Sequence, residues 1–374
     1  MSGGGTAGHI YPALALATEL EARSHTICYV GTPTGPEARL APGAGLDLIA
    51  VPAAGFDRAR PSTLLTSSAG ILRSALKLRR TFAHARPDAV VGFGGYVAIP
   101  VGLAARWLHI PVIIHEQNSV PGMTNRFLAK RARAVAVTYP QTVALFRELV
   151  RPGTTVTLTG NPVRPEVLAA DGGAGRARLG IPADALVLLV FGGSRGARHI
   201  NEALCAAAPE LLEKFPRLHI IHAAGTDDYE RTRAVIEERL RAAQGGQDLL
   251  ARYHLFAYLD AIADSLAAAD LALTRAGATS IAELTALGKP AILVPYPHAT
   301  DDHQTKNARD LAREGGAALM EDSALTSADF MPAASALLSD AQRRDTMAKA
   351  ARSFGRPDAA ARLADCVEAA VPAP

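Results

Sequence analysis

The chain has 374 residues, of which 49% are hydrophobic and 20% are charged, and its formal net charge is +3. This composition excludes a disordered chain, the small net charge gives no indication of a nucleic-acid partner, and the length predicts two domains. Cys28, Cys205 and Cys366 form no Cys-x-x-Cys pair. Their spacing excludes a disulfide framework or a zinc site, and it fits a reducing cytoplasm.

The N-terminal segment predicts a glycine-rich loop followed by a helix. Gly3-Gly4-Gly5-Thr6-Ala7-Gly8 precedes the apolar stretch 10–20, and only two residues come before the glycines. The stretch contains Pro12 and Glu19 and follows no basic region, so we interpret it as the first helix of the fold and not as a signal peptide. No apolar run of the chain reaches the roughly eighteen residues that a membrane span requires.

Short apolar runs rich in Val, Ile and Leu alternate with amphipathic segments along the rest of the chain. Continuous apolar strands separated by helices indicate a parallel sheet that is covered on both faces. The sequence therefore predicts the α/β class, with doubly wound parallel sheets. The expected strands include residues 26–30, 89–92, 112–114, 186–191, 218–221, 271–274 and 291–295.

The sequence also contains an internal repeat. Residues 4–8, Gly-Gly-Thr-Ala-Gly, return as residues 192–196, Gly-Gly-Ser-Arg-Gly, and each copy opens a predicted helix. Residues 89–116 and 271–296 likewise share the order strand, glycine-containing loop, helix, proline turn and strand. Self-similarity of this kind indicates two domains of one type.

We therefore expect two Rossmann-like domains, residues 1–160 and 161–354, with a C-terminal helix in 355–374 that crosses back to the first domain. Ligands of such folds bind at the carboxyl ends of the parallel strands. The sequence thus predicts a binding cleft between the two sheets.

Three glycine-containing loops precede expected helices, after Gly8, Gly196 and Gly277. A helix start offers unpaired backbone N–H groups and the positive end of the helix dipole, which suit phosphate. A nicotinamide enzyme carries an Asp or Glu about twenty residues beyond its glycines, at the end of the second strand. Here that strand, 26–30, is followed by Gly31-Thr32-Pro33, so the missing acid counts against NAD.

Polar side chains accompany these loops. His9 directly follows the first loop and is either a capping residue or a base. His115-Glu116-Gln117-Asn118 ends an apolar strand, at the sheet edge where α/β proteins bind ligands, and we favour a functional role for it. Glu283 lies in the helix that begins near Ala278, where its carboxylate either takes the hydroxyls of a ribose or is simply solvated.

The sequence gives no support for a metal site. It contains no Asp-x-Asp, and neither Asp227-Asp228 nor Asp301-Asp302 has His or Cys at ligand spacing. A metal that holds a diphosphate would need such oxygen ligands. We therefore expect no metal and no cofactor, with helix dipoles and arginines neutralising the phosphates.

Seven segments follow one another along the chain: GGGTAGHIYPALALA, GFGGYVAIP, IPVIIHEQNSVPGMTNRFLA, GNPVR, FGGSRGARHIN, RAGATSIAELTALGKPAILVPYP and DDHQTKNA. In this order they closely resemble the transferases of glycosyltransferase family 28 that complete lipid II in bacterial cell-wall synthesis. The resemblance runs from Gly3 to about Val371 and implies a metal-independent, inverting transferase with two Rossmann-like domains, the GT-B architecture. Its substrates would be UDP-GlcNAc and undecaprenyl-diphospho-MurNAc-pentapeptide (lipid I), whose 4-hydroxyl receives GlcNAc.

The resemblance also implies which residues bind the donor. Ser194 would bond phosphate, Arg164 would contact the nucleotide, and the backbone at Leu259 would read the uracil. Glu283 would take the ribose hydroxyls. The helix start formed by Ala278, Thr279, Ser280, Ile281 and Ala282 would hold the diphosphate, His303 and Gln304 would meet the GlcNAc hydroxyls, and Thr6, Ala7, Gly8 and Asn118 would approach the sugar from the first domain.

For the acceptor, the resemblance places its diphosphate near residues 6–8 and the loop of Gly94 and Gly95. The predicted acceptor-binding residues are Gly94, Gly95, Tyr96, His115 and Asn125. His9 is the expected base for the MurNAc hydroxyl, and Glu116 is the alternative base or the group that orients His9.

A lipid acceptor implies a membrane surface, and residues 71–82 mix apolar side chains with cations as an interfacial helix does. An ordinary amphipathic helix packed on the sheet explains Leu76 and Phe82 equally well, and the resemblance favours membrane contact. The predicted membrane residues are Ile71, Leu72, Arg73, Leu76, Lys77, Arg80 and Trp107. We expect a peripheral protein on the cytoplasmic face of the bacterial membrane, with an anionic lipid surface and the cell-wall and division machinery as partners.

Two alternatives stay open: another GT-B enzyme that uses a UDP-sugar and a soluble acceptor, or a UDP-GlcNAc epimerase. A non-catalytic nucleotide-sugar-binding subunit is disfavoured because one chain carries all seven segments. Members of the family have about half a dozen apolar residues before the first glycines, forming a central strand. We expect either that the natural start lies upstream or that the strand is absent, which would destabilise the first domain and leave residues 6–9 poorly held.

Overall fold

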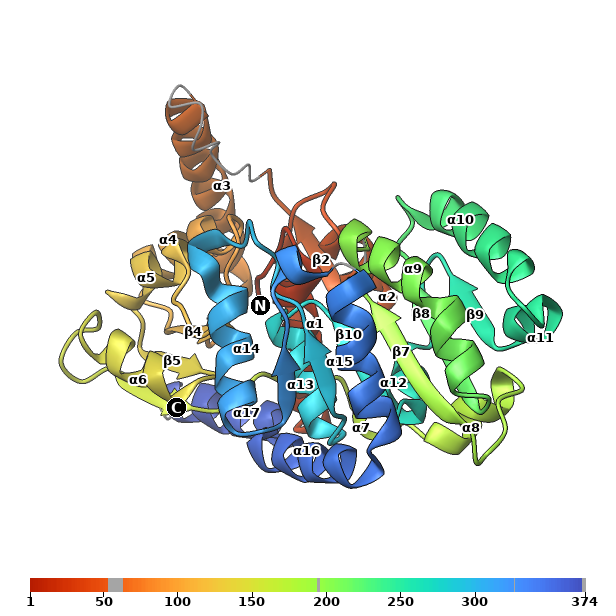
Figure 1. The fold of residues 1–374 in the computed structure, drawn as a ribbon. Coiled ribbons are helices and arrows are strands. Elements are labelled where there is room, and N and C mark those ends of the chain that lie inside the picture. The colour runs from red at the N-terminus through yellow and green to blue at the C-terminus, as the bar shows by residue number, and fades with distance from the viewer. Residues whose placement is uncertain (53–62, 194–195, 326, 372–374) are drawn as a thin grey trace. The chain divides into compact units, whose positions relative to one another are not determined.

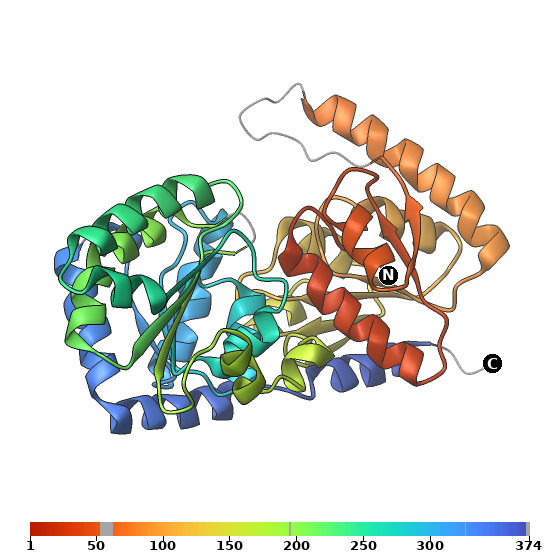
Figure 2. The same cartoon turned by 90° about the vertical axis from the view of Figure 1, so that its right-hand side faces the viewer.

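The computed structural model describes residues 1–52, 63–193, 196–325 and 327–371, drawn in Figures 1 and 2. The chain divides into two compact units. Unit 1 comprises Met1–Arg164 and Pro357–Pro374, and unit 2 comprises Pro165–Arg356. Each unit has its own parallel sheet and its own buried core, which confirms the predicted α/β class with two parallel-sheet domains.

Unit 1 contains strands that follow one another through helical crossovers, as expected for parallel pairing. Its elements are α1 (Ala7–Ala22), β1 (Cys28–Gly31), α2 (Glu37–Gly43), β2 (Asp47–Ala50), α3 (Thr63–Ala85), β3 (Val90–Gly92), α4 (Ala98–Trp107), β4 (Val112–Glu116), α5 (Met123–Ala129), β5 (Ala134–Val137), α6 (Pro140–Arg147), β6 (Thr155–Leu158) and α17 (Ala359–Ala370).

Met1 and Ser2 lie between the two groups of strands in unit 1. One group is β1–β2 and the other is β3–β4–β5–β6, all parallel. Ser2 pairs in parallel with both Val30 and Gly92, the amide of Val30 donates to the carbonyl of Met1 at 2.8 Å, and the amide of Phe93 donates to that of Ser2 at 2.7 Å. These two residues therefore hold the position of a strand between β1 and β3.

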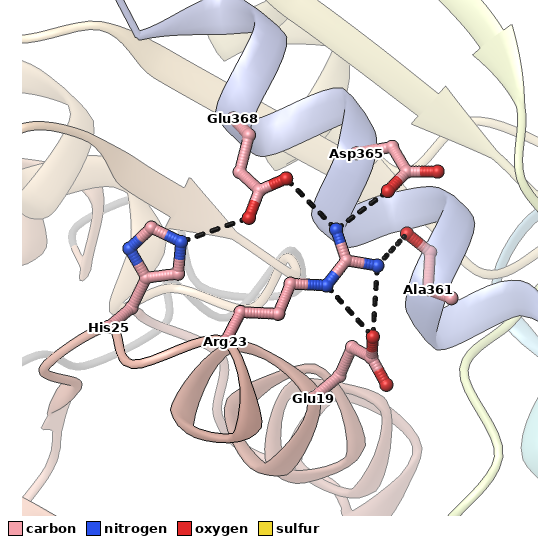
Figure 3. A network of polar contacts seen from close by, with 6 residues as sticks. All are labelled: Glu19, Arg23, His25, Ala361, Asp365 and Glu368. Atoms are coloured by element: carbon pink, nitrogen blue, oxygen red, sulfur yellow. Dashed lines mark hydrogen bonds and ion pairs between the residues drawn. The ribbon is translucent and has the colours of Figure 1, made fainter.

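Helices cover both faces of the unit 1 sheet. Buried side chains of α3, α4, α5 and α6 share one core with the strands, and those of α1, α2 and α17 share the other. The C-terminal helix α17 lies beside α1 (Figure 2). Arg23 at the end of α1 donates to Asp365 at 2.6 Å, to Glu368 at 2.9 Å and to the carbonyl of Ala361 at 3.2 Å (Figure 3). The last helix of the chain is thus part of unit 1.

Unit 2 repeats the plan with six parallel strands in the order β12–β11–β10–β7–β8–β9. The chain starts in the middle of this sheet at β7 and reverses direction at β10, which is the Rossmann-type order. Its elements are α7 (Pro165–Leu168), α8 (Gly172–Arg178), β7 (Leu186–Phe191), α9 (Arg198–Lys214), β8 (Leu218–Ala223), α10 (Tyr229–Ala242), α11 (Gly246–Ala251), β9 (Tyr253–Phe256), α12 (Ile262–Ala268), β10 (Leu271–Thr274), α13 (Ala278–Ala286), β11 (Ala291–Leu293), η1 (Thr300–Asp302), α14 (His303–Arg313), β12 (Ala317–Leu319), η2 (Asp322–Ala324), α15 (Ser327–Ser339) and α16 (Ala341–Phe354).

The point at which the strand order reverses fixes where each unit can bind a ligand. In unit 1 it lies between Ser2 and β3, so the loops 3–6 and 93–97 meet there. In unit 2 it lies between β7 and β10, so the loops that lead into α9 and α13 share one edge of the sheet. The glycine motifs of the sequence therefore fall on the ligand-binding edge of each sheet.

Candidate active site

The first glycine loop of unit 1 holds the imidazole of His9 in a defined tautomer. His9 lies in the first turn of α1 and its side chain is half-buried. Its Nδ1 lies 3.0 Å from the carbonyl oxygen of Gly4 and 3.2 Å from the hydroxyl oxygen of Thr6. A carbonyl oxygen can only accept a hydrogen bond, so Nδ1 carries a proton and the lone pair of the neutral ring is on Nε2. This tautomer suits a base that acts through Nε2.

Two glycines in the loop after β3 bring that loop against His9. Gly94 and Gly95 have φ of +94° and +76°, a region that favours glycine. A Cβ atom on Gly94 would lie 3.3 Å from Nε2 of His9 and 3.7 Å from Nδ2 of Asn125, and a Cβ on Gly95 would lie 2.4 Å from the carbonyl oxygen of Gly4. The absence of both side chains therefore allows His9, Asn125 and the first glycine loop to meet.

His115 lies in β4 with both ring nitrogens engaged inside unit 1. Its Nε2 donates to the carbonyl of Gly160 at 2.9 Å, and its Nδ1 accepts from Nε2 of Gln117 at 3.2 Å. Burial lowers the pKa of His115 to about 4, and the bond to Gly160 opposes that shift only in part. The ring is therefore neutral at pH 7. Both ring nitrogens are engaged within unit 1, and the contact of His115 with the acceptor stays a prediction.

The carboxylate of Glu116 organises the loop between β4 and α5. It accepts from the amide of Gly122 at 2.9 Å, from Nδ2 of Asn125 at 2.9 Å and from the amide of Asn118 at 3.1 Å. Burial raises the pKa of Glu116, whereas these donors oppose the shift. Only 2% of the residue is exposed, and its carboxylate contacts Asn118 and Asn125; its role as a base stays a prediction. For His9, the orienting group that the structure describes is the carbonyl of Gly4.

Several buried polar atoms near these residues have no hydrogen-bond partner within the described part of the chain. They are Oε1 of Gln117, Oδ1 of Asn125 and both side-chain polar atoms of Asn161. Buried polar groups are normally paired with protein, water or a ligand. All three residues belong to predicted motifs at the carboxyl edge of the unit 1 sheet.

In unit 2 the start of α13 has the form expected of a diphosphate site. Gly277 precedes the helix in an extended conformation and makes no side-chain cap, so the first-turn amides point outward from the helix end. Thr279 has a buried hydroxyl without a partner among the described residues. Glu283, one turn further on, is only 4% exposed. Its interpretation as a simply solvated carboxylate is therefore wrong, and its role toward a ribose stays a prediction.

The other predicted donor residues occupy both units. Gln304 accepts from the amide of Tyr296 at 2.9 Å through Oε1, which directs its amide nitrogen elsewhere, and Nδ1 of His303 donates to the carbonyl of Thr300 at 2.7 Å. Leu259 is buried beyond β9. Ser194 lies outside the described residues.

Arg164 belongs to unit 1. Its guanidinium carbon lies 4.2 Å from the centre of the Tyr11 ring, a cation–π contact with α1. Its predicted contact with the nucleotide stays a prediction.

The predicted membrane helix corresponds to α3 and divides into two faces. Ala75, Leu78 and Phe82 are buried in the unit 1 core, whereas Leu72 and Leu76 are 50% and 46% exposed. Arg73, Lys77 and Arg80 are exposed, Ile71 is partly buried, and Trp107 at the end of α4 is 38% exposed. The amphipathic packing explains Phe82 but not Leu76, so the exposed face is available for another surface.

Some features had no signal in the sequence. The contact of the Gly4 carbonyl with Nδ1 of His9 was not predicted, because the glycine loop was interpreted only as a phosphate-binding loop. Asp322 in η2 receives hydrogen bonds from Arg275 and His199 in unit 2, and no motif marked it because its partners are distant in the sequence.

Within the described residues no group of three or more His, Cys, Asp or Glu is placed to hold a metal ion, and no helix is long and apolar enough to span a bilayer.

The two halves of the chain match two family models. Residues 1–137 match the glycosyltransferase family 28 N-terminal domain, and residues 187–363 match the glycosyltransferase family 28 C-terminal domain. The chain is 42% identical to the UDP-N-acetylglucosamine--N-acetylmuramyl-(pentapeptide) pyrophosphoryl-undecaprenol N-acetylglucosamine transferase of Desulforudis audaxviator, over 98% of this chain and 97% of that relative. A transferase of the same name from Nitratidesulfovibrio vulgaris is also 42% identical, over 97% and 94%.

Solved structures agree with the fold. The crystal structure of Acinetobacter baumannii MurG is similar with a TM-score of 0.75 and 32% identity, over 99% of this chain and 98% of that one. A UDP-GlcNAc 2-epimerase from Neisseria meningitidis bound to UDP-GlcNAc has a TM-score of 0.69 with 14% identity, over 98% of both chains. At that identity the second likeness shows the fold alone.

Proposed function

The chain belongs to glycosyltransferase family 28, and we propose that it transfers GlcNAc from UDP-GlcNAc to the 4-hydroxyl of MurNAc in lipid I, forming lipid II. The observation that carries this proposal is the match, at 42% identity and nearly full length on both sides, to a transferase named for that reaction. The motifs that carry the likeness lie at the ligand-binding edge of each sheet, which supports an active enzyme.

We assign the donor to unit 2. The first-turn amides of α13 meet the diphosphate, and they supply partial positive charge where UDP gains negative charge as it leaves. Glu283 accepts from the ribose hydroxyls, and the amide of Gln304 donates to hydroxyls of GlcNAc. The buried hydroxyl of Thr279, which lacks a partner among the described residues, is available to a phosphate oxygen.

We assign the acceptor to unit 1, at the loops that surround His9. The MurNAc 4-hydroxyl attacks C1 of the α-linked GlcNAc, its proton passes to Nε2 of His9, and the bond from C1 to the β-phosphate oxygen breaks with its electron pair on UDP. One displacement inverts the configuration, so the product is β-linked. The carbonyl of Gly4 stabilises the imidazolium that forms, since it accepts from Nδ1 throughout.

The acceptor is a lipid, and we assign the membrane contact to α3. Its exposed Leu72 and Leu76 alternate with Arg73 and Lys77, a pattern that inserts apolar side chains while the cations meet anionic headgroups. With Trp107 this face places the enzyme peripherally on the cytoplasmic side of the membrane. There it supplies lipid II for cell-wall growth and division, whose machinery is its expected neighbour.

The test is transfer from radiolabelled UDP-GlcNAc to a lipid I analogue with a shortened prenyl chain. We expect labelled disaccharide lipid and free UDP. An incubation without acceptor tests the epimerase alternative, because it would yield UDP-ManNAc. A second incubation with soluble sugar acceptors tests the other alternative. Absence of labelled lipid together with either alternative product contradicts the proposal.

A further inference from the structure

A buried carboxylate in unit 2 connects the segments that lead to the donor site. Asp322 is the first residue of η2, and its side chain is 8% exposed. Its Oδ1 accepts from Nη1 of Arg275 at 2.5 Å, and its Oδ2 accepts from Nδ1 of His199 at 2.7 Å. Each carboxylate oxygen therefore accepts a hydrogen bond, one from Arg275 and the other from His199.

The two partners stand at the starts of the two glycine-loop helices. Arg275 follows β10 and comes directly before Ala276 and Gly277, which lead into α13. His199 is in the first turn of α9, directly after the second glycine loop. One carboxylate thus ties together the two helix starts at the point where the strand order of unit 2 reverses.

Arg275 extends the connection to a third segment. Its Nη1 also lies 3.2 Å from the carbonyl oxygen of Pro295 and 3.4 Å from that of Val294, and its guanidinium carbon lies 5.6 Å from the centre of the Tyr296 ring. The amide of Tyr296 in turn donates to Gln304. The segment between β11 and α14 leads to the predicted GlcNAc-binding residues His303 and Gln304 at the start of α14, and the same arginine therefore holds it.

The negative charge of Asp322 favours the pairing of Arg275 with this carboxylate over contact of Arg275 with a phosphate. Burial raises the pKa of Asp322, but hydrogen bonds and charge from His199 and Arg275 outweigh it and leave the pKa below its ordinary value. The carboxylate is therefore ionised at pH 7 and neutralises the half-buried guanidinium. Removal of one member of such a pair leaves an uncompensated buried charge.

From these contacts we infer that Asp322 is a positioning residue of the donor site: it fixes Arg275 and His199 so that the starts of α9 and α13 bind the diphosphate of the donor together. This inference rests on the proposed function for the identity of the ligand. Asp322 touches the donor loops only through its partners, so its effect is on affinity for UDP and UDP-GlcNAc and not on the proton transfer at His9.

Unit 2 offers a matched control in Asp270, which directly precedes β10, whereas Arg275 directly follows it. The carboxylate of Asp270 pairs with Arg176 at 2.9 Å and accepts a hydrogen bond from the amide of Val187 at 2.8 Å. Asp322→Asn and Asp270→Asn each replace a carboxylate paired with arginine by its amide, one at the ligand-binding edge and one away from it. We expect both variants to be less stable than the parent, and only Asp322→Asn to lose affinity for the ligand.

The experiment measures UDP binding by calorimetry and thermal unfolding for the whole chain and both variants. We expect Asp322→Asn to weaken UDP binding about tenfold or more and to raise KM for UDP-GlcNAc with kcat little changed, and we expect Asp322→Glu to recover part of the affinity. Asp270→Asn should lower Tm and keep UDP affinity within about twofold. UDP affinity of Asp322→Asn equal to the parent, or an equal loss in Asp270→Asn, overturns the inference. A parent chain that binds no UDP contradicts the proposed function instead, and with it the ligand named here.

Discussion

The carbonyl oxygen of Gly4 lies 3.0 Å from Nδ1 of His9. This contact fixes the tautomer that leaves the basic lone pair on Nε2, on the side where the glycines after β3 approach. If His9 is the base that we propose, this backbone carbonyl orients it as a carboxylate side chain orients many catalytic histidines.

Replacement of His9 should therefore affect chemistry more than binding. We expect His9→Gln to lower kcat by about 10²- to 10⁴-fold, the usual contribution of a general base, with little change in the Kd for UDP, whose binding we assign to unit 2. Steady-state kinetics and UDP titration measure the two quantities. A variant that keeps more than about a tenth of the parent kcat would remove His9 from the role of base.

Substitution of Gly94 should displace the same imidazole. Gly94→Ala places a Cβ 3.3 Å from Nε2 of His9 at a φ of +94°, so we expect kcat to fall at least tenfold, or about 1.4 kcal/mol in barrier, together with a modest loss of Tm. Gly153→Ala is the control, since Gly153 has a φ of +85° but a Cβ there meets nothing within 4 Å. Gly153→Ala should lower Tm through backbone strain and leave kcat unchanged. Similar kcat values for Gly94→Ala and Gly153→Ala would count against the proposed site.

Unit 1 should lose stability in mild acid because of His115. Its pKa in the folded protein is about 4, against 6.5 for an ordinary histidine, so between these values the unfolded chain binds a proton that the folded chain does not. Stability then falls as the pH drops from about 6.5 toward 4, by on the order of 3 kcal/mol for this group.

The measurement is chemical unfolding of the parent and of His115→Gln at pH 7 and pH 5. We expect His115→Gln to have a lower free energy of unfolding than the parent at pH 7, but to lose less of it between pH 7 and pH 5. An equal loss in both proteins would show that other groups control the acid sensitivity. Burial also lowers the pKa of His222 in unit 2, to about 3. His222→Gln is therefore the corresponding variant for the acid sensitivity of unit 2.

The contact between α1 and α17 should contribute to unit 1 stability without affecting catalysis. Arg23 bonds Glu19, Asp365, Glu368 and the Ala361 carbonyl (Figure 3). We expect Arg23→Ala to lower the free energy of unfolding by about 1–2 kcal/mol, since three charged partners lose one cation that is partly exposed. Arg362→Ala, which removes a pair within α17 alone, should cost less than about 0.5 kcal/mol. Denaturant unfolding with equal costs for both would contradict a role of Arg23 in joining the helices.

The exposed face of α3 should contribute to membrane binding. We expect Leu72→Ser combined with Leu76→Ser to weaken binding to phosphatidylglycerol vesicles about tenfold or more, while transfer to a soluble lipid I analogue is unchanged. Leu145→Ser is the control, because Leu145 is an exposed leucine of α6, 42% exposed, in the same unit. Equal vesicle binding of both variants would place the membrane surface elsewhere.

The sequence predicted the fold because its signals are local and repeated. Apolar strands, glycine loops and the second copy of each motif determine parallel sheets, and the observed strands begin and end close to the predicted ones. Position along the chain also placed the His115-Glu116-Gln117-Asn118 run at a sheet edge, since parallel strands end together, whereas Gly94 and Asn125 came from the family resemblance alone.

Side-chain detail was not predictable in the same way. The burial of His115, with both nitrogens engaged, and the pairing of Asp322 with Arg275 and His199 depend on residues that are distant in sequence, so no spacing rule shows them. The two residues before the first glycines gave no strand signal, yet they pair with both Val30 and Gly92, because backbone hydrogen bonds do not depend on side-chain pattern.

The most direct test of the account is the anomeric configuration of GlcNAc in the lipid product, read from the proton coupling of C1 by NMR. A single displacement by the MurNAc 4-hydroxyl, with His9 as base, predicts a β-linked disaccharide from the α-linked donor. An α-linked product, or GlcNAc attached at a position other than the 4-hydroxyl, would contradict it.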